Sequence, residues 1–188
     1  RQVDRHRVVI NSKTPSRDAA GVTADVERYL QEMDTEYIDT VLLHGIETAE
    51  EYALRDSGME ALHRMKAAGK IRAVGISTHL GTGEIMEICA TDPRVEVVLT
   101  TVNIDGQMLK GTMSDHLPLV KKVYDAGKGI CLMKTLAQGG LTQTPATIRE
   151  AIRYNLSLPY AHSICVGVNA ISEVDYAVEV AGEVEAGN

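Results

Sequence analysis

Short apolar segments alternate with amphipathic helical segments along the chain, and this alternation limits the fold more than any other feature. Six strand–helix pairs follow one another in strict order. The expected strands span 8–14, 37–45, 70–79, 95–103, 129–135 and 163–168, and the expected helices span 18–33, 57–69, 83–90, 116–126, 144–156 and 172–181. Such alternation is typical of parallel sheets with right-handed helical crossovers. We therefore predict an α/β protein with a single domain over residues 1–188, because no interval resembles a linker.

Capping residues mark several of the helix ends. Ser57 is expected to cap the helix over 57–69, and Gly69 to close it. Thr144 is the expected cap of the helix over 144–156, with Pro145 at its first position. The sequence predicts a loop over 103–115, where Gly and Asp recur.

Two parallel architectures fit six strand–helix units. An open doubly wound sheet usually has a glycine-rich phosphate loop after its first strand, and none follows residues 8–14. A (β/α)8 TIM-type barrel has typically ~250 residues, so six units in 188 residues fall two units short. Because the sequence begins at Arg1 without Met, we expect an incomplete barrel that lacks its two amino-terminal units. Two open strand edges would favour a homo-oligomer or cover by another chain.

Composition excludes several kinds of partner. The net charge of -7 argues against nucleic acid and against an anionic membrane surface, since both need a basic face. No apolar run approaches the ~20 residues that span a bilayer. The cysteines are far apart, form no CxxC pair and predict neither a metal site nor a disulfide framework. Cys131 and Cys165 are expected to pack as small hydrophobic residues, and this usage of cysteine favours the cytoplasm.

Polar residues gather where the expected strands end. In a barrel of parallel strands this edge forms one mouth, where enzymes of this architecture place catalytic groups. The residues at these ends are Lys13, His44, Ser77, Thr78, His79, Asn103, Lys134 and Gly167. A single polar strand end is more often structural, and His44 alone would fit a core histidine bonded to a carbonyl. Lys13 beside His44 is more specific, because an ammonium group keeps an imidazole neutral and able to polarise a carbonyl.

The segments that carry these residues resemble the aldo-keto reductase family. They are SKT (12–14), DVERYLQEMDTEYIDTVLLHG (25–45) and ALHRMKAAGKIRAVGISTH (61–79). The resemblance covers nearly the whole chain, from the third to the eighth barrel strand of the family, and MKTLAQGGL resembles a bacterial branch. It implies reduction of aldehydes and ketones with NADP or NAD, a small carbonyl compound as partner, and Lys13 and His44 as catalytic residues. The cofactor-binding residues would be Ser77, Thr78, Asn103, Lys134 and Gly167.

The sequence departs from the family pattern in three places. The catalytic aspartate and tyrosine of the family lie on the two units that this chain does not contain, and Tyr52 is the one tyrosine in the loop after His44. The segment 168–176 has no basic residue to hold the 2′-phosphate of NADP, which leaves the choice between NADP and NAD open. Backbone amides around Gly167 could still bind a phosphate. Thr78 stands where asparagine is common in the family.

Two other classes of function remain open at this point. A Schiff-base lyase would use Lys13 or Lys134 as its nucleophile. A non-catalytic barrel remnant that binds nucleotide or a partner chain would explain the missing proton donor. A metal hydrolase with His44 and His79 is disfavoured, because the sequence has no HxH pair and no evident carboxylate ligand. The loops over 46–56 and 103–115 carry no signature of the substrate.

Overall fold

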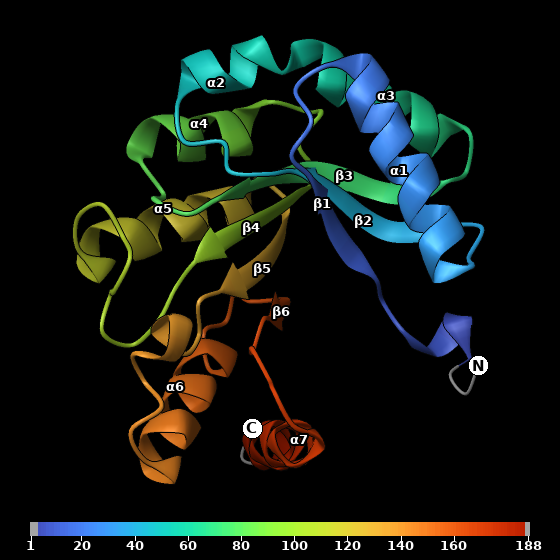
Figure 1. Ribbon diagram of the computed structural model, residues 1–188. Helices are drawn as coiled ribbons and strands as arrows, with labels where there is room; N and C mark the ends of the chain where they lie inside the picture. Colours follow the sequence, from blue (N-terminus) through green and yellow to red (C-terminus); the bar gives the residue numbers. More distant parts are fainter. Residues whose placement is uncertain (1–3, 187–188) are drawn as a thin grey trace.

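Six parallel strands form one curved sheet in chain order, as the alternation predicted (Figure 1). The computed structural model describes residues 4–186. The strands are β1 (Asn11–Thr14), β2 (Ile38–Leu43), β3 (Ile71–Thr78), β4 (Val97–Thr101), β5 (Gly129–Met133) and β6 (Ser163–Ile164). Every neighbouring pair is parallel and every strand is joined to the next by a crossover that contains a helix. The fold is therefore α/β and corresponds to part of a (β/α)8 barrel.

The helices cover the convex side of this sheet (Figure 1). They are α1 (Ala19–Met33), α2 (Ala49–Leu54), α3 (Asp56–Ala67), α4 (Gly83–Thr91), α5 (Met113–Asp125), α6 (Pro145–Leu156) and α7 (Ile171–Ala186), with short 3-10 helices η1 (Arg5–Arg7) and η2 (Ala137–Gly139). The main core lies between sheet and helices and includes Val26, Leu43, Leu62 and Ile76. A second, smaller cluster of Leu42, Leu99, Cys131 and Met133 lies apart from it. The strands thus bury side chains on both faces, as is typical of parallel strands with continuous apolar runs.

Several expected helix ends are confirmed. The Thr144 hydroxyl accepts a hydrogen bond from the backbone N–H of Thr147 at 3.1 Å, and Pro145 opens α6. Gly69 follows the end of α3 in the left-handed region, with φ of 77°, a conformation that glycine adopts at little cost.

Two boundaries after β2 were predicted wrongly. The segment after His44 was expected to be a loop and contains α2. Ser57 does not cap α3, which begins at Asp56 with no side-chain cap. The reason is that Arg55 alone separates the two helices and has φ -108° and ψ 16°, so the chain has no extended residue at Ser57 that could serve as a cap.

The fifth helix also begins earlier than expected, at Met113 rather than at residue 116. The Thr112 hydroxyl accepts a hydrogen bond from the Asp115 N–H at 3.2 Å and starts the helix there. Pro118 lies inside α5, where it lacks the N–H that would continue the helical hydrogen bonds. The first and last strands are shorter than the apolar runs that predicted them, and Val9 is 80% exposed outside β1.

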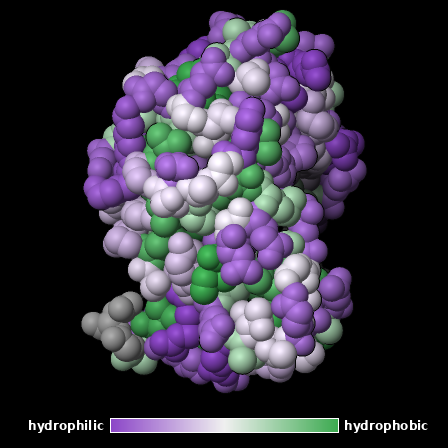
Figure 2. All heavy atoms as spheres, turned by 90° about the vertical axis from the view of Figure 1, so that its left-hand side faces the viewer, coloured by the Kyte–Doolittle hydropathy of each residue, from purple (hydrophilic) through white to green (hydrophobic). Residues whose placement is uncertain are grey.

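The helix-covered face is mixed in character. Figure 2 shows hydrophilic side chains spread over this face with smaller hydrophobic areas between them. Among the described residues, no helix has the length and apolar character that a bilayer crossing requires.

Candidate active site

The strand register puts the predicted catalytic residues on the concave face of the sheet. Lys13 lies opposite Leu42, and Leu42 belongs to the smaller cluster that the helices do not cover. Ser77 lies opposite Leu99 of the same cluster. Residues two apart along a strand share a face, so His44 continues the face of Leu42 just beyond the end of β2. The carboxyl ends of β1, β2 and β3 therefore bring Lys13, His44 and Ser77 to one mouth.

His44 faces a second histidine across this mouth. The rings of His44 and His79 meet edge to face, with centroids 5.6 Å apart. Burial lowers the pKa of His44 below its ordinary value, and the positive charge of Lys13 lowers it further. Burial is also the main cause that lowers the pKa of His79. Both imidazoles are therefore neutral near pH 7, the form that can donate one hydrogen bond to a carbonyl oxygen.

The contribution of Lys13 can be measured directly. Lys13→Met is expected to raise the pKa of His44 towards its ordinary value, because the ammonium charge that disfavours the imidazolium is removed. NMR titration of the His44 ring protons measures this shift. Lys128→Met is the matched control. Lys128 directly precedes β5, at the opposite end of the strands, and its ammonium donates to the carbonyl of Asp92 at the end of α4. An unchanged His44 titration in Lys13→Met would contradict the pairing.

The loop after β5 brings a second lysine to the mouth. Lys134 has φ of 61°, in the left-handed region that costs a side-chain-bearing residue about 1 kcal/mol or more. Ala137 and Gln138 also have positive φ, at 48° and 55°. Lys13 and Lys134 line the same cavity of about 490 Å³, together with Cys165 of the segment after β6. The strained loop therefore holds a second cationic side chain at the site.

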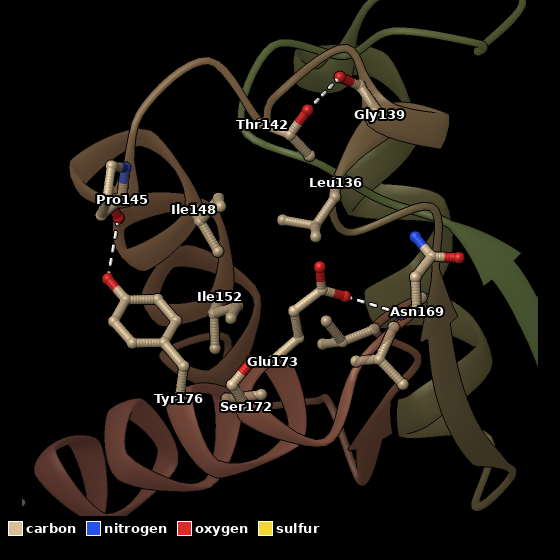
Figure 3. A pocket seen from close by; sticks show the side chains of 14 residues that line it. Leu136, Gly139, Thr142, Pro145, Ile148, Ile152, Asn169, Ser172, Glu173 and Tyr176 are labelled. Carbon is tan, nitrogen blue, oxygen red and sulfur yellow. Dashed lines mark hydrogen bonds between the residues drawn. The ribbon is translucent and has the colours of Figure 1, made fainter.

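A second cavity of about 570 Å³ adjoins the first and lies between α6, α7 and the segment after β6 (Figure 3). The two cavities share lining residues and therefore adjoin, and together they are called the groove. The shared residues are Leu136, Gly139, Thr142, Gly167, Val168 and Asn169. Gly167, predicted as a cofactor contact, thus lies where the two halves meet.

The outer half of this groove has an acidic side chain and no basic one among its lining residues. Glu173, in the first turn of α7, points into the cavity and accepts a hydrogen bond from the backbone N–H of Asn169 at 2.6 Å (Figure 3). The nearby Arg149 is engaged elsewhere, in ion pairs with Glu179 and Glu183. The groove therefore has two lysines at the mouth and a carboxylate beside the junction of its two halves.

The other predicted cofactor contacts are buried and hydrogen-bonded within the protein. The Ser77 hydroxyl accepts from the Gly45 N–H at 3.0 Å, and the Thr78 hydroxyl donates to Glu47 at 2.8 Å. Both residues have no exposed surface. Asn103 is also fully buried, and both ends of its side-chain amide bond to the backbone of Gln107 at 2.9 Å. These three residues hold loops around the mouth.

Glu47 organises the mouth but was missed by the sequence reasoning. Its carboxylate accepts hydrogen bonds from the Thr78 hydroxyl and from the backbone N–H groups of His79 and Leu80, at 2.7 and 2.9 Å for the latter two. It therefore ties the segment after β2 to the end of β3 and fixes His79. The only signal in the sequence was an acidic residue in a polar stretch, which is no different from its solvated neighbours.

Tyr52 does not reach the mouth. It lies on α2, and its hydroxyl donates a hydrogen bond to Asp92 at the end of α4, at 2.8 Å. Burial, and then this hydrogen bond, raise the pKa of the phenol well above its ordinary value. Its expected position in a loop beside His44 was wrong, because that segment is helical and turns the side chain towards the helix layer. Within residues 4–186, no group of three or more His, Cys, Asp or Glu side chains could hold a metal ion.

Fold and site together define a parallel-barrel protein whose polar mouth lies at the carboxyl ends of the strands. The chain belongs to the aldo/keto reductase family, whose model matches residues 1–174. Family and fold support an oxidoreductase that acts on carbonyl groups. No protein of curated function matches the chain in sequence.

Solved aldo-keto reductases share this fold. The holo form of AKR11C1 from Bacillus halodurans has a TM-score of 0.75 and 20% identity over 96% of this chain and 68% of its own. A putative aldo-keto reductase from Pseudomona aeruginosa has a TM-score of 0.76 and 20% identity over 97% of this chain and 69% of its own. The thermostable Tm1743, solved with the inhibitor epalrestat, has a TM-score of 0.74 and 16% identity over 96% of this chain and 68% of its own.

Proposed function

We propose that the groove binds a nicotinamide nucleotide and that Lys13 and His44 activate the carbonyl group of a small aldehyde or ketone for reduction. Within residues 4–186, the side chains of Lys13, His44 and Lys134 have no hydrogen-bond or ion-pair partner, although all three are half-buried at one mouth. Partly desolvated polar groups without partners are costly, and a bound anion and a carbonyl oxygen would supply what they lack.

The chemistry that these residues can perform follows from their charges. A reduced nicotinamide supplies a hydride when bound. The neutral His44 ring donates a hydrogen bond to the carbonyl oxygen and stabilises the negative charge that develops there. The Lys13 ammonium adds a positive charge on the same side and keeps His44 neutral. The family resemblance assigns the proton to a tyrosine that this chain does not contain, and Tyr52 is already bonded to Asp92.

The groove fits an elongated anionic nucleotide. Lys134 and Gly167 line its middle, where phosphate groups would find the Lys134 ammonium. The apolar outer half, with Ile148 and Ile152, suits an aromatic base. We assign Ser77, Thr78 and Asn103 to positioning, because their polar atoms already bond to protein groups.

We expect NADH to bind about tenfold or more tightly than NADPH, because Glu173 disfavours a 2′-phosphate and can accept from a ribose hydroxyl. Glu173→Gln should narrow this ratio, mainly through tighter NADPH. Fluorescence titration with both nucleotides measures it. Glu179→Gln on the same helix is the matched control, since Glu179 pairs with Arg149 and does not line the groove. NADPH bound as tightly as NADH by the unaltered chain would refute this preference.

Aldehyde-dependent oxidation of NADH tests the reaction itself. Saturable NADH binding without any turnover would instead favour a nucleotide-binding module.

We place the protein in the cytoplasm as one domain, consistent with its three free cysteines.

A further inference from the structure

Two cysteines that are distant in the sequence meet on the concave face. The Sγ atoms of Cys131 on β5 and Cys165, directly after β6, are 3.7 Å apart. Both were expected to pack as small hydrophobic residues, and for Cys165 this was wrong, because the residue is exposed and lines the cavity of Lys13. We propose that this pair is a modification site at which a hydroperoxide converts the two thiols into a reversible disulfide.

The two thiols differ in exposure and in pKa, as disulfide formation through one reactive thiolate requires. Cys165 is exposed, whereas Cys131 is 5% exposed and packs among Leu99 and Met133. The hydrogen bond between the sulfur atoms lowers the pKa of Cys165 below its ordinary value, against the effect of burial, and the charge of Lys13 lowers it further. The same hydrogen bond and burial raise the pKa of Cys131. Cys165 is thus the accessible thiolate, and Cys131 keeps its proton beneath it.

The oxidation balances in two steps. The Cys165 thiolate attacks one oxygen of hydrogen peroxide, the O–O bond breaks, and sulfenic acid and hydroxide form. The Cys131 sulfur then attacks the sulfenic sulfur, the S–O bond breaks, and the Cys131 proton leaves with the hydroxyl group as water. The thiols lose two electrons to the peroxide. A dithiol reductant reverses the reaction by thiol–disulfide exchange.

The backbone around Cys165 allows the two sulfur atoms to come within bonding distance. The sulfur atoms must move from 3.7 Å to about 2.05 Å apart. On the described chain, β6 pairs along one side only and through two residues, and Cys165 follows it outside the strand. Backbone hydrogen bonds keep the two segments adjacent, from the Cys165 N–H to the Leu132 carbonyl at 2.7 Å and from the His162 N–H to the Ile130 carbonyl at 3.0 Å. The Cys165 side can therefore adjust while Cys131 stays in the core.

Cys89 provides an internal control. It is fully buried on α4, and burial raises its pKa to about 12, so it should not react under the same conditions.

Peroxide treatment of the chain without nucleotide, followed by mass spectrometry, tests the proposal. We expect the loss of two hydrogen atoms, a Cys131–Cys165 peptide link under non-reducing conditions, and full reversal by dithiothreitol. Cys89→Ser should leave the link intact. Cys131→Ser should leave Cys165 as a sulfenic acid that dimedone traps, and Cys165→Ser should abolish both products. Oxidation of Cys165 to sulfinic acid without a link in the unaltered chain, a link to Cys89, or no reaction would overturn the proposal. None of these outcomes depends on nucleotide binding, so the proposed function is tested separately.

Discussion

His44→Ala is expected to lower kcat for the proposed aldehyde reduction by about 10²–10³-fold, the loss typical of removing one hydrogen-bond donor to a developing oxyanion. The alanine cannot donate to the carbonyl oxygen, and the Lys13 ammonium does not replace the imidazole N–H at that position. Steady-state turnover with NADH and an aldehyde measures the effect. The affinity for NADH should change little, because His44 does not line either half of the groove.

His63→Ala is the matched control for this prediction. His63 is also half-buried, but it lies on α3 and its ring bonds to the carbonyl of Arg94, outside the mouth. This variant should lose some stability and keep its turnover number. Undiminished turnover in His44→Ala, with His63→Ala also active, would show that His44 is not a catalytic residue.

The order of the fold could be predicted because it depends on local pattern. Each strand is a short apolar run and each helix has an apolar stripe, so both remain visible in one sequence. The α2 helix was missed because Ala49–Leu54 is short, acidic and mostly exposed, and Tyr52 is its one buried residue. Ser57 was misassigned as a cap because capping depends on the backbone before it, and a preceding helix ending at Leu54 is invisible to a pattern search.

Only the site residues that lie at the ends of strands could be predicted from the sequence. Lys13 and His44 both follow apolar runs, and parallel strands bring such ends to one edge whatever their exact register. The meeting of Cys131 with Cys165 depends on the offset between β5 and β6, which pairs Cys131 with Ser163. Glu47 is fixed by three hydrogen bonds to one segment, 31 to 33 residues away. The offset between two strands and the path of a loop cannot be predicted from the types of the residues involved.

Gly75→Ala is expected to destabilise the fold by about 3 kcal/mol, at the upper end of overpacking effects. Gly75 lies on β3 opposite Val97 of β4. A Cβ atom at this position would lie 1.8 Å from the Val97 carbonyl oxygen and 2.8 Å from its carbonyl carbon. Both are backbone atoms of a paired strand, so they cannot move aside as a side chain would. The strands must separate locally, which weakens the sheet beneath Ser77.

Urea denaturation measures this loss as a lower midpoint. Gly83→Ala is the matched control, because Gly83 is the first residue of α4 and a Cβ there would meet nothing within 4 Å. Its midpoint should stay equal or rise slightly, since alanine reduces the entropy of the unfolded chain. The double variant Gly75→Ala/Val97→Ala separates backbone from side-chain crowding. A backbone clash leaves the double variant no more stable than Gly75→Ala, whereas recovery of the midpoint would locate the crowding in the Val97 side chain.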